Sequence, residues 1–195
     1  MIHLDRSAPM LGTVFHGGIR MPALKPDCHV DGRGYFMETW NERDLSGVLA
    51  REFSLECRGF VQDNESWSRP KVVRGLHWQK GQSKLVRVVS GRIVDFMVDV
   101  RDGSDTFGDF DAVILSGDNF RQVYVPDGWA HGFLALESSK VAYKVDSYWD
   151  PSRERGARWD DPSVGLPLLL GKWFDWFDPA AVILSEKDAA LPPLQ

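Results

Sequence analysis

Short runs of β-branched and aromatic residues recur along most of this chain, and turn signals such as Asp102-Gly103 and Asp127-Gly128 separate them. Runs of this length and composition, bounded by Gly, Asp and Ser, are typical of β-strands. The pattern therefore predicts a mainly β chain. The expected strands are Tyr35–Trp40, Val72–His77, Lys84–Ser90, Arg92–Val100, Asp111–Leu115, Gln122–Val125, His131–Leu136 and Lys140–Tyr148.

The stretch 92–100 alternates most regularly between apolar and polar residues. Side chains alternate between the two faces of a strand, so Val94 and Phe96 share one face while Asp95 and Asp99 share the other. We expect the apolar face to pack against a core and the acidic face to meet polar surroundings.

Helices are few in this pattern. One is expected from Glu42 to Arg51, with Asn41 as its N-cap and apolar residues on one side. A second, shorter turn is expected after Ser185, whose hydroxyl can cap it. Many short antiparallel strands with a few short helices favour a double-sheet, cupin-like jelly roll, whose concave interior can hold a ligand.

Composition narrows the class of protein further. A chain of 195 residues fits one domain, and we find no linker, repeat or low-complexity tract between residues 1 and 195. A hydrophobic fraction of 43% argues against disorder. The net charge is -5, and Lys and Arg are interleaved with Asp and Glu, so we expect no nucleic-acid partner. An anionic ligand would need a local cluster of cations.

Cys28 and Cys57 are the only cysteines and have no CxxC or zinc spacing, which favours two reduced thiols over a disulfide. No run approaches the roughly 18 apolar residues of a membrane span. Charged residues also precede the first apolar run, unlike an export signal. We therefore expect a cytoplasmic protein with no membrane partner.

Candidate chemistry begins with Arg74, His77 and Lys84, which stand at the ends of two strand-like segments. An arginine can clamp a phosphate, a histidine can move a proton, and a lysine can stabilise an enolate oxygen. The combination suits proton transfer next to a carbonyl. The alternatives are a structural histidine and, for Lys84, a solvated strand edge.

Residues 125–133 have the Pro-x-Gly-x-x-His shape of a second cupin motif, which would aim His131 into a barrel. A cupin metal site also needs a His-x-His pair and a glutamate, yet the equivalent place reads His77-Trp78-Gln79. We therefore expect no metal ion and no other cofactor.

Two further residues are candidates for proton transfer. Tyr143 can return a proton, and Asp188 can orient His77 if the C-terminal part of the chain folds back across the barrel. Residue spacing leaves the alternatives open, namely a core or rim tyrosine and an exposed carboxylate.

A series of short motifs occurs in order from about Asp31 to Asp188. They are Gln62-Asp63-Asn64, Arg74-Gly75-Leu76-His77, Lys84-Leu85-Val86-Arg87, Thr106-Phe107-Gly108, residues 126–133, Tyr143-Lys144 and Ser185-Glu186-Lys187-Asp188. Together they resemble the dTDP-4-dehydrorhamnose 3,5-epimerase family.

The resemblance implies roles for the candidate residues. His77 matches the proton acceptor of the family, Tyr143 its proton donor and Asp188 the carboxylate paired with the histidine. It further implies that Lys84 and His131 lie near the C4 oxygen and the sugar hydroxyls. Arg74 would then bind the diphosphate.

The resemblance also implies a nucleotide site shared between two subunits. Arg33, Phe36 and Glu38 match residues that a neighbouring subunit supplies, which implies a homodimer with swapped N-terminal strands. The alternative is a core phenylalanine and a surface arginine. The other implied binding residues are Gln62, Asn64, Trp149, Glu154 and Lys187.

Three departures from the family pattern affect the expected substrate. The loop between His77 and Lys84 is shorter by about three residues, and Trp149 replaces the usual Tyr or Phe that stacks on the base. From about residue 171, Gly171–Asp178 looks like an aromatic insertion before the segment that would close the site. Its aromatic residues are expected to cover core or dimer surface rather than bind ligand.

The expected activity is epimerisation at C3 and C5 of dTDP-4-dehydro-6-deoxy-D-glucose to dTDP-4-dehydro-L-rhamnose, through an enolate. One alternative is a monofunctional 3- or 5-epimerase acting on a related nucleotide-4-keto-deoxysugar. Two others are a metal-dependent cupin enzyme and a sugar-nucleotide binding protein without turnover. The missing His-x-His pair counts against a metal-dependent cupin enzyme. The intact candidate set of His77, Tyr143 and Asp188 counts against a binding protein without turnover.

Overall fold

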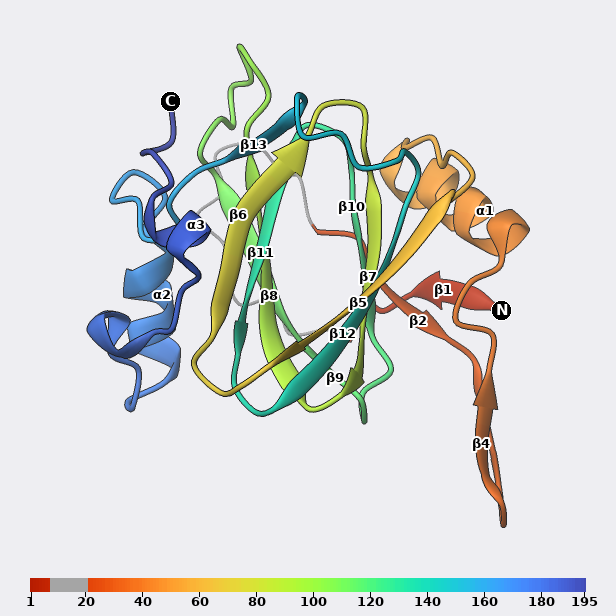
Figure 1. Cartoon of the computed structure of the whole chain (residues 1–195). Coiled ribbons are helices and arrows are strands. Elements are labelled where there is room, and N and C mark those ends of the chain that lie inside the picture. Colours follow the sequence, from red (N-terminus) through yellow and green to blue (C-terminus); the bar gives the residue numbers. More distant parts are fainter. Residues whose placement is uncertain (8–20) are drawn as a thin grey trace.

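Two antiparallel sheets face each other in the computed structural model, which describes residues 1–7 and 21–195 (Figure 1). The six-stranded sheet has the order β1 (Ile2–Leu4), β2 (Ala23–Pro26), β10 (Gln122–Val125), β7 (Lys84–Ser90), β12 (Ser139–Val145) and β5 (Gln62–Ser68). The five-stranded sheet has the order β13 (Glu154–Gly156), β6 (Val73–Gln79), β11 (Trp129–Ala135), β8 (Arg92–Asp99) and β9 (Phe110–Ser116). This is the expected jelly-roll class.

Three apolar clusters hold these layers together. The first fills the space between the sheets, where Val86 and Val123 of the six-stranded sheet meet Ile93 and Met97 of β8. The second lies on the outer face of the five-stranded sheet, which α2 (Leu166–Trp173) covers. The third lies under α1 (Glu42–Phe53), on the outer face of the six-stranded sheet. Figure 1 shows the two helices on opposite sides of the sheet pair.

Both predicted helix starts are confirmed. The Asn41 side chain accepts a hydrogen bond from the Asp44 amide, and the apolar side of α1 is buried. Ser185 caps α3 (Glu186–Ala189) by accepting a hydrogen bond from the Asp188 amide at 3.0 Å. Such caps satisfy amides that have no partner within the helix, so these short helices begin at defined residues.

Strand β8 differs in one respect from its expected environment. Val94 and Phe96 belong to the outer cluster as predicted, but the acidic face is also buried because β8 lies inside its sheet and faces the other sheet. Asp95 and Asp99 have no exposed surface, and their polar surroundings are hydrogen-bonding side chains such as His131 and Arg101.

Several elements of the described residues were not predicted, namely β1, β2, β3 (Cys28–Asp31), β5, β13, α2 and a short 3-10 helix at Pro179–Ala181, and two expected strands end early. β5 is rich in polar residues because it is an edge strand, and α2 is a run of leucines with little alternation. The strands expected at Tyr35–Trp40 and Lys140–Tyr148 end at Met37 and Val145. No helix of the described residues is long and apolar enough to cross a membrane.

The aromatic segment 171–178 continues from α2 across the outer face of the five-stranded sheet. Phe174 and Phe177 pack against the outer cluster, while Trp173 and Trp176 remain 40% and 49% exposed. The two phenylalanines therefore cover core, as expected.

A two-stranded hairpin projects away from the sheets (Figure 1). It consists of β3 (Cys28–Asp31) and β4 (Gly34–Met37). Val30 is 75% exposed and Phe36 67% exposed on it. Apolar side chains this exposed on a projecting arm usually mark a contact with another molecule.

Candidate active site

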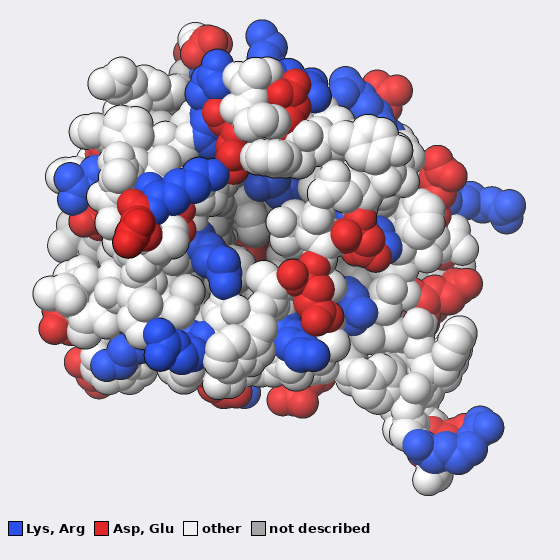
Figure 2. Space-filling model, in the orientation of Figure 1, with Lys and Arg blue, Asp and Glu red and all other residues white. Residues whose placement is uncertain are grey.

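A cavity of about 310 Å³ lies between the two sheets and collects most of the candidate residues. Figure 2 shows a hollow on this side of the molecule with Lys and Arg side chains around it. The candidates that line the cavity are Arg74, His77, Lys84, His131, Tyr143, Trp149, Glu154, Lys187 and Asp188. Strands of both sheets, together with α3, therefore supply one site.

His77 and Asp188 form a close pair although 111 residues separate them in the chain. His77 Nε2 lies 2.6 Å from Asp188 Oδ1, and Asp188 is only 7% exposed. The C-terminal segment reaches β6 because Ile183 bridges Val72 in parallel and Ser185 then starts α3. The expected return of the C-terminal segment across the barrel thus brings the two side chains together.

The charge state of Asp188 follows from its contacts. Burial raises the pKa of this carboxyl, but the hydrogen bond and charge of His77, with the Ser185 hydroxyl, lower it below its usual value. An ionised Asp188 accepts the Nε2 proton of His77 and leaves Nδ1 as the basic nitrogen. Nδ1 is buried and has no hydrogen-bond partner among the described residues. The pair is suited to accept a proton.

Gly75 allows β6 to approach β11 at this point. Its φ is +111°, and a Cβ there would lie 2.6 Å from the His131 carbonyl oxygen and 2.8 Å from the Gly132 Cα. Only glycine fits such a close backbone contact. His77 then lies directly opposite His131 in the strand register, so both histidines reach the cavity side by side.

Lys84 enters the cavity from β7, on the other sheet. Its ammonium donates a hydrogen bond to the His77 carbonyl oxygen at 3.2 Å. Desolvation inside the cavity lowers the pKa of Lys84 to about 8, and the negative charges of Asp95 and Glu154 oppose this shift. The side chain is still mostly charged at neutral pH and can stabilise an oxyanion.

Tyr143 also comes from the six-stranded sheet, on β12, and so faces His77 across the cavity. Burial raises the pKa of its phenol, the charge of Arg74 opposes this, and Glu154 adds to it, leaving the pKa above its usual value. The phenol therefore carries its proton at neutral pH and can donate it.

His131 has a carboxylate partner of its own that sequence reasoning did not assign to the site. His131 Nε2 lies 2.8 Å from Asp95 Oδ2. The alternation in 92–100 placed Asp95 on the polar face of its strand, and that was the available signal. Which histidine would meet it depended on the pairing of β8 with β11.

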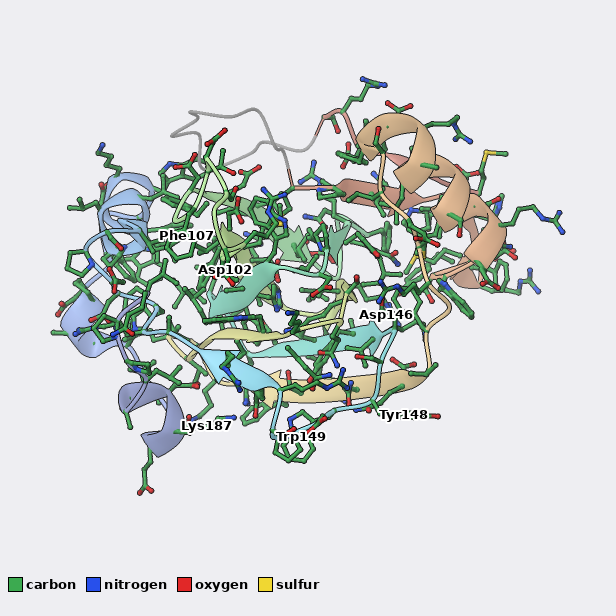
Figure 3. The ribbon with its side chains drawn as sticks, turned by 90° about the horizontal axis from the view of Figure 1, so that it is seen from above. Asp102, Phe107, Asp146, Tyr148, Trp149 and Lys187 are labelled. Atoms are coloured by element: carbon green, nitrogen blue, oxygen red, sulfur yellow. The ribbon has the colours of Figure 1, made fainter. Side chains whose placement is uncertain are left out.

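The rim of the cavity is a connected polar network. Trp149 Nε1 donates to Glu154 Oε2 at 3.3 Å, and Lys187 Nζ lies 2.9 Å from Glu154 Oε1. Figure 3 shows Trp149 and Lys187 along the same edge of the molecule. Gln62 on β5 bonds Asn64 at 2.8 Å and accepts from the Trp149 amide. Gln62 and Asn64 thus lie beside the rim rather than in the cavity wall.

Arg33, Phe36 and Glu38 lie outside this assembly. All three are exposed on or next to the projecting hairpin, and Arg33 pairs with Asp31 of the same hairpin. One chain therefore does not bring them to its own cavity. Within residues 1–7 and 21–195, no group of three or more His, Cys, Asp or Glu side chains is arranged to hold a metal ion.

Comparison with known proteins supports the resemblance found in the motifs. Residues 20–195 match the family model of dTDP-4-dehydrorhamnose 3,5-epimerase. The dTDP-4-dehydrorhamnose 3,5-epimerase of Methanothermobacter thermautotrophicus is 45% identical over 175 residues, covering 88% of each chain.

Solved structures agree with this match. The Legionella pneumophila dTDP-6-deoxy-D-glucose-3,5-epimerase in complex with dTDP-4-keto-L-rhamnose has 38% identity and a TM-score of 0.77, covering 89% of this chain and 87% of that one. The Bacillus anthracis dTDP-4-dehydrorhamnose 3,5-epimerase has 36% identity and a TM-score of 0.78, covering 95% and 100%. This chain thus belongs to the dTDP-4-dehydrorhamnose 3,5-epimerase family of isomerases.

Proposed function

We propose that this protein epimerises C3 and C5 of dTDP-4-dehydro-6-deoxy-D-glucose to give dTDP-4-dehydro-L-rhamnose. The observation that carries the proposal is the placement of a base and an acid on facing sheets. The His77–Asp188 pair lines one side of the cavity, and Tyr143 comes from the opposite sheet. Inversion at carbon requires loss of a proton on one face and its return on the other.

The steps follow from the groups present. The C4 ketone acidifies the protons on C3 and C5, and His77 accepts one of them while Asp188 stabilises the resulting imidazolium. The electron pair moves onto the C4 oxygen, where the Lys84 ammonium stabilises the enolate. Tyr143 then donates a proton to the opposite face of that carbon. The imidazolium of His77 releases its proton to solvent and the Tyr143 phenolate takes one from solvent, which resets both groups for the second carbon. Base and acid each contribute about 10²- to 10⁴-fold to the rate.

The nucleotide is bound at the rim. Arg74 already donates to Ser68 Oγ and to the Trp67 carbonyl, and its charge remains available for the diphosphate. Trp149 is 59% exposed and offers its indole face to the base. His131 binds the sugar hydroxyls, and Gln62, Asn64, Glu154 and Lys187 complete the binding set.

We infer that the protein is a homodimer in which the projecting hairpin of one copy supplies Arg33, Phe36 and Glu38 to the cavity of the other. Their exposure, and their absence from the residues that line the cavity of their own chain, support this arrangement. We also infer that the whole chain is one catalytic domain that works in the cytoplasm. The two free thiols of Cys28 and Cys57 fit that compartment.

A monofunctional epimerase is the second candidate. A 3'-monoepimerase from Streptomyces bikiniensis, solved in complex with dTDP-quinovose, has 28% identity and a TM-score of 0.75, covering 89% of this chain and 83% of that one. The same base and acid can serve one carbon or two. Whether one carbon or both are inverted therefore has to be measured on the substrate.

The test is NMR of the purified protein with dTDP-4-dehydro-6-deoxy-D-glucose in D₂O, with deuterium followed separately at C3 and C5. The proposal expects deuterium at both carbons together with the inverted product. Deuterium and inversion at one carbon alone would support the monofunctional reading. No exchange at either carbon would contradict both.

A further inference from the structure

The loop between β12 and β13, residues 146–153, carries Trp149 but has no buried side chain of its own. Tyr148 and Trp149 are 68% and 59% exposed, and Figure 3 shows both at the edge of the molecule. Apolar packing therefore does not fix this loop. An aromatic ring stacks on a nucleobase only where it is held in place, so the position of Trp149 depends on other contacts.

One side chain of β6 makes three hydrogen bonds to this loop. Gln79 Nε2 donates to the Tyr148 carbonyl oxygen at 3.0 Å and to Ser147 Oγ at 3.2 Å. Gln79 Oε1 accepts from the Asp150 amide at 2.7 Å. A backbone amide only donates and a carbonyl only accepts, so these partners also fix which way the Gln79 amide faces. The bonds reach the residues on both sides of Trp149.

Gln79 is itself held in a fixed place. It is only 3% exposed, and its backbone pairs with Glu154 of β13, whose carboxylate accepts a hydrogen bond from the Trp149 indole. The short turn that follows Gln79 adds a bond from Gln82 Nε2 to the Ser147 carbonyl oxygen at 2.9 Å. The loop that carries Trp149 is thus anchored to the end of β6.

We propose that Gln79 is a positioning residue for nucleobase binding, which fixes the 147–150 loop so that the indole of Trp149 is in place to stack on the base. The inference rests on the proposed function, which gives Trp149 that role. Gln79 lines the cavity, but both its N–H groups and its oxygen already bond the loop. A loop ordered before binding loses less conformational entropy when the ligand arrives, so these bonds raise affinity through Trp149.

The experiment measures dTDP binding by isothermal titration calorimetry in Gln79→Met, which keeps the length of the side chain and removes all three bonds. We expect affinity to fall about three- to tenfold, at most the loss expected from removing the Trp149 ring itself. Ser139→Ala is the matched control, because buried Ser139 also takes part in three hydrogen bonds, at the opposite end of β12. It should leave dTDP affinity unchanged.

Two further readouts distinguish positioning of Trp149 from general damage to the fold. Inorganic pyrophosphate has no base, so its affinity should be the same in Gln79→Met and in the unaltered protein. In a Trp149→Ala background, Gln79→Met should lower dTDP affinity by less than about twofold, because Gln79 acts through Trp149. Additive losses in the double variant, an equal loss for pyrophosphate, or unchanged dTDP affinity in folded Gln79→Met would each overturn the inference.

If Gln79→Met does not fold, Gln79→Ala removes the same bonds, leaves room for water to satisfy the freed loop groups, and is read in the same way. Calorimetry needs no turnover, so its result is distinct from the test of the proposed function, which the D₂O exchange of the unaltered protein decides. In turnover, Gln79→Met should raise KM and leave kcat nearly unchanged. A loss of kcat at unchanged KM would contradict a role in positioning Trp149.

Discussion

The two ends of the candidate site are built in different ways. At the catalytic end, His77, Asp188, Lys84 and Tyr143 converge in one cavity, with the histidine and the aspartate 2.6 Å apart. At the proposed nucleotide end, Phe36 and its neighbours lie on an exposed hairpin that projects away from that cavity.

This difference separates the residues proposed for catalysis, which one chain brings together, from those proposed for nucleotide binding, which it does not. Proton transfer needs groups held within a few tenths of an ångström, which packed strands and a capped helix provide within one chain. A nucleotide is large enough to be bound at several points, so a second copy of the chain can supply part of its site. Changes at the catalytic end should therefore lower kcat, and changes on the hairpin should raise KM.

The largest effect is expected from His77→Ala, which removes the proposed base. We expect kcat to fall by about 10³- to 10⁴-fold and deuterium exchange at C3 and C5 to fall in parallel. Asp188→Asn leaves the imidazole in place and should reduce kcat less. Exchange that continues at the normal rate in His77→Ala would show that another group is the base.

Tyr143→Phe should have the next largest effect, because it removes one hydroxyl and keeps the ring. We expect inversion to fall by about 10²-fold or more while proton abstraction by His77 continues. Deuterium should then enter the substrate without matching formation of the inverted product. Equal loss of exchange and inversion would place Tyr143 in the abstraction step instead.

A smaller effect is expected from Phe36→Ala on the hairpin. It should raise KM by about tenfold, equivalent to about 1.4 kcal/mol, with kcat changed little. Val30→Ala is the control, since it shortens another exposed apolar side chain of the same hairpin. A large loss of kcat in Phe36→Ala with unchanged KM would contradict a binding role.

The smallest effect is expected from Trp149→Phe, which keeps an aromatic face and removes the bond to Glu154. We expect dTDP affinity to fall about threefold or less, and Trp149→Ala to lower it about tenfold. Isothermal titration calorimetry with dTDP measures both. Equal affinity in the Phe and Ala variants would exclude stacking at this residue.

Sequence patterns predicted local features of this molecule better than long-range ones. The cap at Asn41 and the alternation in 92–100 are short-range signals, and both appear in the structure. Edge strand β5 was missed because its polar residues hide the strand pattern, and α2 because a leucine run can form either element.

For the candidate site, too, sequence patterns indicated local features better than long-range contacts. Residue types in the 74–84 segment pointed to proton transfer, but only the resemblance placed Asp188 beside His77, since spacing says nothing about contacts 111 residues apart. Asp95 was expected to face polar surroundings, but the identity of its hydrogen-bond partner depended on which strand pairs with β8. Long-range contacts of this kind come from packing of the whole chain.

The most direct test of the shared site combines two defective variants in one dimer. His77→Ala and Phe36→Ala chains, carrying different tags, are co-expressed and the mixed dimer is purified. If the hairpin serves the partner's cavity, one of its two sites has an intact His77 and an intact Phe36, so activity at low substrate should return to about half that of the unaltered dimer. If each hairpin serves its own chain, both sites stay defective and activity should not exceed the mean of the two parents.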